Sequence, residues 1–109
     1  MSGYGIFIYA DGVRYEGQFL LDKKEGFGIY KWTDGRVYEG WWHKGKQHGV
    51  GSYFDPVKKS LRFGLWENGK RVRWYDDQQQ KDIQSGILDY RKDFTEETSA
   101  KALPNLVTF

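Results

Sequence analysis

Two stretches of the chain resemble the first part of a phosphate-binding loop, Gly40-x-x-x-x-Gly45-Lys46 and Gly64-x-x-x-x-Gly69-Lys70. Such a loop holds phosphates with backbone N–H groups and the lysine, and it needs a Ser or Thr after the lysine for magnesium. Gln47 and Arg71 stand at that position. Both stretches also occupy corresponding places in a repeat, so we interpret them as turns between hairpins and not as nucleotide sites.

Other residues with chemical potential are equally well explained by structure. His43 and His48 are the two histidines, and a turn between them could bring their rings together. Without cysteine or an evident carboxylate ligand, they do not complete a zinc site. No serine lies in a nucleophile-elbow pattern. Glu16 and Glu39 recur in register, which favours a shared structural role. We therefore predict no catalytic residue, no metal site and no cofactor.

A repeat must position these residues. Gly-x-Gly pairs recur with a constant period, Tyr-Glu-Gly recurs on the same period, and a third copy of the second motif begins slightly later than that period predicts. The copies are Gly3-x-Gly5, Gly26-x-Gly28 and Gly49-x-Gly51, then Tyr15-Glu16-Gly17, Tyr38-Glu39-Gly40 and Gly64-Leu65-Trp66. Self-similarity at this period indicates units that stack on one another.

Each unit has the pattern of a β-hairpin. Residues 28–32 and 37–42 are aromatic-rich and alternating, and Thr33-Asp34-Gly35-Arg36 between them is a strong turn signal. Alternation places aromatic rings and glycines on one face of each strand, so a ring can lie over a neighbouring glycine. The predicted structural residues are Tyr15, Gly17, Tyr38, Gly40, Trp42, Gly49, Gly51, Gly64 and Trp66.

The motif Tyr-Glu-Gly-x-Trp followed by Gly-Lys-x-x-Gly-x-Gly resembles the membrane occupation and recognition nexus (MORN) repeat, and residues 38–51 match it throughout. The first copy carries Phe19 in place of the tryptophan, and the third carries Arg62-Phe63-Gly64 in place of Tyr-Glu-Gly. The resemblance covers about residues 3–71. It implies a mostly β fold, an elongated, twisted antiparallel sheet of about three stacked hairpins. It also implies a role in scaffolding, self-association or membrane attachment.

We expect residues 1–75 to form the array, with units near 3–25, 26–48 and 49–72, and residues 76–109 to form a capping tail. Met1-Ser2-Gly3 is either a cloning remnant or a cut point inside a longer array, and the start in the middle of a motif favours the second. Residues 76–84 predict a short helix that ends at Ser85-Gly86, and residues 96–103 predict a second one ended by Pro104. A repeat array needs its last open face covered. The apolar residues expected to cover it are Ile83, Ile87, Leu88, Tyr90, Phe94 and Leu103.

The composition fits a ring-based core in a reducing compartment. Aromatic residues make up 18% of the chain although the mean hydropathy is -0.79, and cysteine is absent. The longest apolar run, residues 6–10, is far shorter than the roughly 20 residues of a membrane span. We expect a cytoplasmic protein that acts at the cytoskeleton or at the inner face of a membrane.

The predicted function is a non-catalytic scaffold or docking module that binds a protein partner or a second copy. Four apolar residues should lie on the face opposite the Tyr-Gly-Trp stripe, where a one-sided sheet should be polar. Either the tail covers them or they form a contact surface. These predicted partner-binding residues are Trp41, Phe54, Phe63 and Leu65.

Charge offers an alternative. Residues 1–75 carry 13 Lys and Arg against 8 Asp and Glu, whereas residues 76–109 carry 4 against 7. The basic residues near the last hairpin would bind phosphoinositides or another anionic lipid surface, or they would keep the end of the array polar. They are Lys58, Lys59, Arg62, Lys70, Arg71 and Arg73. A regulatory module of a larger enzyme is a further alternative. Nucleic acid ranks below these, since the net charge is only +2.

Overall fold

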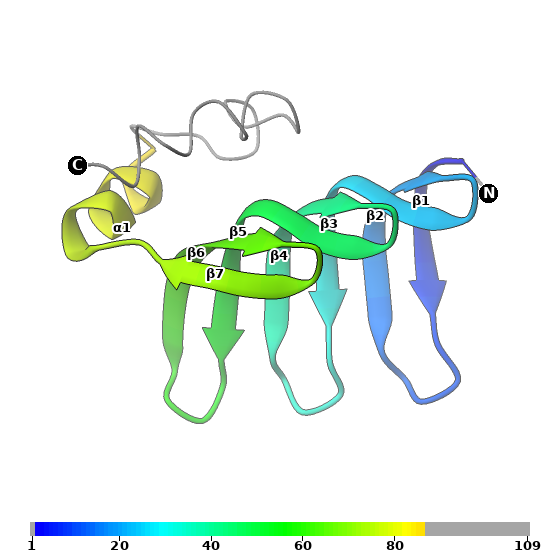
Figure 1. Cartoon of the computed structure of the whole chain (residues 1–109). Coiled ribbons are helices and arrows are strands. Elements are labelled where there is room, and N and C mark those ends of the chain that lie inside the picture. Colours follow the sequence, from blue (N-terminus) through cyan, green and yellow to red (C-terminus); the bar gives the residue numbers. More distant parts are fainter. Residues whose placement is uncertain (1, 87–109) are drawn as a thin grey trace.

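The computed structural model of the chain describes residues 2–86, which form one open antiparallel sheet followed by a helix (Figure 1). Each strand pairs with the next one along the chain, in the order β1-β2-β3-β4-β5-β6-β7. The elements are β1 (Gly3–Ile8), β2 (Arg14–Leu20), β3 (Lys23–Lys31), β4 (Val37–His43), β5 (Lys46–Asp55), β6 (Ser60–Glu67), β7 (Lys70–Trp74) and α1 (Asp77–Gln84). The predicted mostly β fold of stacked hairpins is therefore confirmed.

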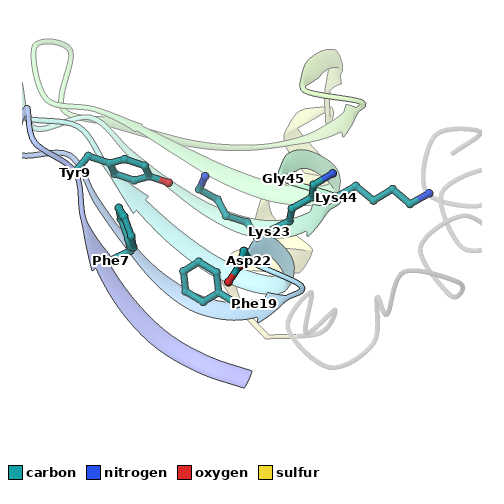
Figure 2. Close-up of a pocket in the computed structure, with 8 residues that line it drawn as sticks. Phe7, Tyr9, Phe19, Asp22, Lys23, Lys44 and Gly45 are labelled. Atoms are coloured by element: carbon teal, nitrogen blue, oxygen red, sulfur yellow. The ribbon is translucent and has the colours of Figure 1, made fainter. Parts of the chain in front are cut away.

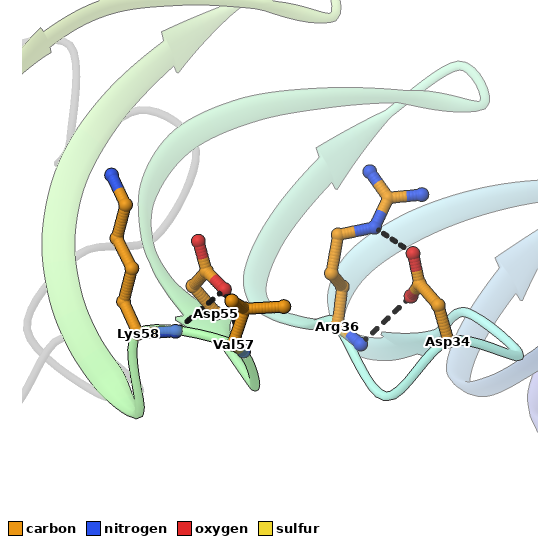
Figure 3. Close-up of polar contacts among 5 residues, drawn as sticks. All are labelled: Asp34, Arg36, Asp55, Val57 and Lys58. Carbon is orange, nitrogen blue, oxygen red and sulfur yellow. Dashed lines mark hydrogen bonds and ion pairs between the residues drawn. The ribbon is translucent and has the colours of Figure 1, made fainter.

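Aspartates fix three hairpin tips that lie in a row along one side of the sheet (Figure 1). Asp34 Oδ1 accepts a hydrogen bond from the backbone N–H of Arg36 at 3.0 Å, and Asp55 Oδ1 accepts one from Val57 at 2.9 Å (Figure 3). At the β1–β2 tip, Asp11 Oδ1 accepts from Val13 at 3.1 Å. An aspartate at each tip thus closes the turn on its own backbone.

The opposite tips are two-residue turns with left-handed backbone. Between β4 and β5, Lys44 and Gly45 have φ angles of 51° and 83°, and Asn68 and Gly69 between β6 and β7 have 51° and 85°. Positive φ at both central residues is the type I′ arrangement that suits a tight hairpin. The interpretation of the Gly-Lys stretches as turns between hairpins is therefore confirmed. The lysines of both stretches begin strands and not helices.

The two glycines of each Gly-x-Gly pair have different roles. Gly26 and Gly49 have φ angles of 72° and 110°, which side chains rarely adopt. They lie near the register shifts between β2 and β3 and between β4 and β5. Gly51 instead faces Gly40 on β4, and an added methyl group there would lie 2.6 Å from the hydroxyl oxygen of Tyr38. One glycine bends the strand, and the other makes room for a ring.

Aromatic side chains form the core of one face, which we call the aromatic face. The Tyr38 hydroxyl donates to the backbone carbonyl of Trp41 at 3.0 Å, and the Tyr15 hydroxyl donates to that of Gln18 at 2.8 Å. Figure 2 shows rings of this face inside the curve of the sheet. The buried members are Tyr15, Phe19, Tyr38, Trp42 and Trp66, and partly buried Tyr9, Tyr30, Trp32, Tyr53 and Trp74 pack against them.

Helix α1 covers the last hairpins on the opposite face. Asp76 caps the helix, with its carboxylate accepting from the Gln79 backbone N–H while the Gln79 side chain accepts from the Asp76 N–H. Ile83 of α1 is buried with Val50 and Phe63 of the sheet. The predicted helix at residues 76–84, its end at Ser85-Gly86 and the capping role of Ile83 are therefore confirmed. The second predicted helix and the other predicted capping residues, Ile87, Leu88, Tyr90, Phe94 and Leu103, lie outside the described residues.

Gln80 of α1 completes the sheet where β7 stops. β7 pairs with β6 as far as Trp74 opposite Gly64, so the backbone of Phe63 lies beyond the last pair. The Gln80 side-chain amide accepts from the Phe63 N–H at 2.7 Å and donates to the Phe63 carbonyl at 2.8 Å. A side-chain amide carries the same donor and acceptor as a peptide group. The Tyr75 N–H also donates to the Phe63 carbonyl at 3.1 Å, so Tyr75 and the Gln80 side chain together continue the pairing of β6 past the end of β7.

Candidate docking surfaces

The two histidines do approach each other, but they serve hairpin packing. Their ring centroids lie 5.8 Å apart. His43 Nδ1 lies 2.9 Å from Glu25 Oε2, and the other oxygen of Glu25 accepts from the Lys44 N–H at 3.1 Å. His48 Nδ1 accepts from the Asn68 N–H at 3.4 Å. Among residues 2–86, no group of three or more His, Cys, Asp and Glu side chains is arranged to hold a metal ion.

The recurring glutamates make structural contacts. Glu16 Oε1 accepts a hydrogen bond from the Tyr4 hydroxyl at 2.9 Å, and Glu16 Oε2 lies 3.8 Å from the Arg14 guanidinium. The carbonyl of Glu39 accepts from the Ser52 hydroxyl at 3.3 Å. The contacts with Tyr4 and Ser52 link neighbouring strands.

The four predicted partner-binding residues lie on the face opposite the aromatic face, but they are not equally accessible. Phe63 is only 5% exposed and is enclosed with Val50, Tyr75 and Ile83, so its side chain belongs to the core beneath α1. Trp41 and Leu65 are partly buried against the same cluster. Phe54 is partly buried on β5. A role in partner binding stays a prediction for Trp41, Leu65 and Phe54, whereas Phe63 is a core residue because α1 covers it.

The six predicted lipid-binding residues do not share one surface. Lys58 and Lys59 lie at the β5–β6 tip, and Lys70 begins β7 at the opposite tip. Arg62 and Arg71 lie on the aromatic face, where their guanidinium carbons are 4.1 and 4.6 Å from the centroid of the Trp74 ring. Arg73 pairs with Leu65, which points to the opposite face. The sheet separates the basic residues that the sequence placed close together.

The two edges of the sheet differ in charge. β7 has the sequence KRVRW, and its Lys70, Arg71 and Arg73 are exposed. β1 has the sequence GYGIFI and carries no charged residue. Its exposed apolar side chains are Tyr4, Ile6, Phe7 and Ile8, with exposed fractions of 65%, 50%, 43% and 65%. Charged residues protect an edge strand from further pairing. β7 has this protection and β1 lacks it.

Two hollows of about 310 Å³ each lie on the aromatic face. The first lies near β1 and is lined by Phe7, Tyr9, Phe19, Asp22, Lys23, Lys24, Lys44 and Gly45 (Figure 2). The second, which we call the Trp74 pocket, is lined by Trp32, Arg36, Gln47, Tyr53, Trp66, Arg71 and Trp74. Both are open at the surface and combine ring faces with cationic side chains.

Sequence reasoning missed Lys24, Gln47 and Arg36 as residues of these hollows. Lys24 and Gln47 are one repeat period apart, as Gly26 and Gly49 are, so the repeat that was found through glycines also relates these two positions. That spacing was the available signal. It was hidden because one position is charged and the other is neutral, and the glycine pattern alone says nothing about side chains that lie over the rings.

An open sheet of stacked aromatic hairpins, with packing glycines in register, defines a repeat protein that offers surfaces and edges for binding. The family model of the MORN repeat matches residues 1–14, 15–35 and 38–56. The chain therefore belongs to the MORN repeat family, whose repeats are generally non-catalytic modules of protein or membrane interaction. The matches end at residue 56, whereas the sheet continues to Trp74.

No curated protein matches the chain in a sequence search. Within residues 2–86, no helix is long and apolar enough to cross a membrane.

Proposed function

We propose that this chain is a non-catalytic docking module that pairs through its β1 edge with a β1 strand of a second copy. The single observation that carries the proposal is the difference between the two ends of the sheet. At one end, the three cationic residues of β7 protect the edge, and the Gln80 side chain occupies the backbone groups of Phe63 on β6. At the other end, β1 offers backbone groups and apolar side chains with no protecting charge.

Pairing of two β1 strands would bury what the edge exposes. Tyr4, Ile6 and Ile8 alternate with Gly5 and Phe7, so they lie on one side of the strand. In an antiparallel pair around a two-fold axis, each strand contacts the same strand of the partner, and the assembly is closed. Because the β7 end is protected, the pairing stops at two copies. A scaffold needs such a limited, oriented contact.

Light scattering across a range of concentrations tests this proposal on the full chain. We expect a dimer that dissociates on dilution for the natural sequence. The Ile6→Lys and Ile8→Lys substitutions place a charge at the edge and should shift the dissociation at least tenfold to higher concentration. The control is Val57→Lys at the β5–β6 tip, where the natural side chain is 90% exposed. It should leave the dimer unchanged.

A natural chain that remains monomeric at all concentrations would refute the pairing of two copies. A dimer that the two β1 variants do not weaken would place the contact elsewhere. The partly exposed Trp41 and Leu65 on the opposite face would then be the residues to change next.

A further inference from the structure

The first hollow of the aromatic face contains an internal cation. Lys24 Nζ lies 5.3 Å from the centroid of Tyr9, 5.5 Å from those of Tyr15 and Tyr30, and 5.4 Å from that of Trp42. Cations within about 6 Å of an aromatic centroid are attracted by the charge distribution of the ring. Four rings contributed by three strands and a hairpin tip thus form a cage, and the protein's own lysine fills it.

Three of the four rings have counterparts around the Trp74 pocket one unit later, without the lysine, whereas the counterpart of Tyr15 is the fully buried Tyr38, which does not line the pocket. One repeat period after Tyr9, Tyr30 and Lys24 stand Trp32, Tyr53 and Gln47, and Trp42 corresponds to Trp66. Gln47 is shorter than lysine and uncharged. The Trp74 pocket lies at this place, with the uncharged Gln47 in its lining where the first hollow has Lys24. The Trp32 and Tyr53 centroids are 6.3 Å apart, and those of Trp66 and Trp74 are 5.8 Å apart, so the walls of the pocket are ring surfaces in contact.

Arginines bear on which charge the pocket accepts: Arg36 and Arg71 line it, and Arg62 does not line it but contacts the Trp74 ring. The guanidinium carbon of Arg36 lies 4.8 Å from the Trp32 centroid, and Arg62 and Arg71 both lie against Trp74. Arg36 has an ion pair with Asp34 at 2.7 Å. Within residues 2–86, Arg62 and Arg71 make these ring contacts and no ion pair with a carboxylate. Two guanidinium groups that share one ring repel each other and leave N–H donors for an incoming anion.

These charges disfavour a cationic occupant of the Trp74 pocket. Ring faces attract a cation, but the guanidinium groups of Arg36 and Arg71 in the lining and of Arg62 beside Trp74 repel one. A carboxylate gains from the same neighbours. The ring walls still favour an apolar group, so the best occupant combines an apolar side chain with adjacent carboxylates.

The stacked arginines also decide between an acidic peptide and the polyanions. Single-stranded nucleic acid needs free ring faces for its bases. Here Arg36 lies over Trp32, and Arg62 and Arg71 lie over Trp74. Tyr53 and Trp66 remain as ring surfaces for one apolar side chain, which is too few for a series of stacked bases. A phosphoinositide headgroup is polar throughout and would leave the ring-lined hollow without an apolar occupant. Of the six residues predicted to bind such a headgroup, only Arg71 lines the pocket, and Lys58 and Lys59 lie away from it at the β5–β6 tip.

We propose that the Trp74 pocket binds an acidic peptide segment of a partner protein, with one bulky apolar side chain in the hollow and flanking carboxylates on Arg62 and Arg71. A volume of about 310 Å³ is at the lower end of ligand pockets and suits one large side chain. The pocket lies toward β7 and contains no β1 residue, so the proposal is independent of the pairing of β1 strands.

Fluorescence anisotropy with labelled, end-blocked nonapeptides tests the proposal on the full chain. The first peptide has a central phenylalanine flanked by glutamates, the second has lysines in place of the glutamates, and the third has serine in place of the phenylalanine. We expect the first to bind at least tenfold more tightly than either of the others. The double substitution Arg62→Gln with Arg71→Gln should weaken its binding at least tenfold.

The matched control is Lys58→Gln with Lys59→Gln, which removes the same charge at the β5–β6 tip and should change binding less than twofold. Far-ultraviolet circular dichroism confirms that both double variants remain folded. An equal loss in both variants would overturn the proposal in favour of non-specific charge attraction. Tighter binding of the lysine peptide would overturn it in favour of a cation cage.

Two further probes separate the other classes of ligand. These are an oligothymidine strand and phosphatidylcholine vesicles that contain 5% phosphatidylinositol 4,5-bisphosphate. If either binds in a way that requires Arg62 and Arg71 while the acidic peptide does not bind, the peptide proposal is wrong. If neither binds through these arginines while the acidic peptide does, the proposal is supported.

Discussion

At the scale of single residues, the repeat assigns different constraints to glycines that look alike in the sequence. Gly51 faces Gly40, and its missing side chain leaves the space that the Tyr38 ring fills. Gly69 lies in a turn with a φ of 85°, and the nearest atom to an added methyl group is 3.8 Å away. A larger residue is therefore opposed at Gly51 by lack of space and at Gly69 by the left-handed backbone conformation.

We expect Gly51→Ala to destabilise the fold more than Gly69→Ala. The first substitution forces the fully buried Tyr38 out of its position, which should cost about 3 kcal/mol or more. The second places alanine in left-handed backbone and should cost roughly 1 kcal/mol. Urea denaturation of both variants measures the free energies of unfolding. Equal losses would mean that the Tyr38 ring can move away without cost.

The recurring residues allowed the packing of rings over glycines to be predicted from the sequence, but not the separate role of each glycine. Recurrence of Gly-x-Gly with Tyr-Glu-Gly predicted that rings pack over glycines, and the structure confirms it for Tyr15 and Tyr38. The separate roles of the two glycines could not be predicted, because positive φ and steric room both select glycine. The cage around Lys24 was missed for a related reason. A lysine in a polar turn looks solvated until the rings beneath it are placed.

At the scale of elements, α1 acts as a cap that combines apolar burial with strand-like hydrogen bonding. Ile83 is 5% exposed against the sheet, and the Gln80 amide pairs with both backbone groups of Phe63. The sequence predicted the helix and the need for a cap, since its polar run begins with Asp76 and ends before Gly86. The pairing of a glutamine side chain with the backbone of β6 depends on where β7 ends. No local pattern specifies that point.

Substitution of Gln80 should therefore loosen the end of the array. Gln80→Ala removes the acceptor of the Phe63 N–H, whereas the Phe63 carbonyl keeps the hydrogen bond from the Tyr75 N–H at 3.1 Å. The loss should cost about 1–3 kcal/mol and increase hydrogen exchange in β6. Gln78→Ala is the matched control on the same helix, where the side chain is exposed and bonds to Asp82 at 3.0 Å. It should cost less than about 0.5 kcal/mol. Similar exchange in both variants would show that α1 docks without Gln80.

The strand boundaries show where sequence patterns stop being informative. Alternation predicted a strand at residues 28–32, whereas β3 runs from Lys23 to Lys31. The first part of β3 crosses the register shift opposite Gly17 and Phe19. A bulge interrupts the period of two while pairing continues. The sequence pattern therefore locates the regular half of each strand and misses the half beyond the bend.

At the scale of the whole molecule, the rings form two cores on opposite faces of one sheet. The aromatic face holds Tyr15 in its centre, and the face under α1 holds Tyr75. Within residues 2–86, one helix, α1, covers part of one face of this sheet. The stability of the sheet therefore depends on tyrosine and tryptophan rings, and the O–H and N–H groups of these rings need hydrogen-bond partners when they are buried.

The two buried tyrosines predict that the fold loses stability in alkali. Burial raises the pKa of Tyr15 and of Tyr75 above the ordinary value of 10.0. The unfolded chain then releases these protons at lower pH than the folded chain does. The contribution to stability is complete below about pH 10 and decreases above it, by about 1.4 kcal/mol per pH unit for each tyrosine. Urea denaturation between pH 8 and pH 12 measures this slope.

Tyr75→Phe separates the two contributions. Within residues 2–86 the Tyr75 hydroxyl is buried and has no hydrogen-bond partner, so its removal should leave the stability at pH 7 unchanged or raise it by up to about 1 kcal/mol. Above pH 10 the variant should lose stability less steeply than the natural chain, because Tyr75 no longer contributes while Tyr15, and Tyr30 and Tyr4, whose pKa values are also raised, remain linked. An unchanged alkaline slope would mean that Tyr75 ionises equally easily in both states. Its ring would then be reached by water from the side of α1.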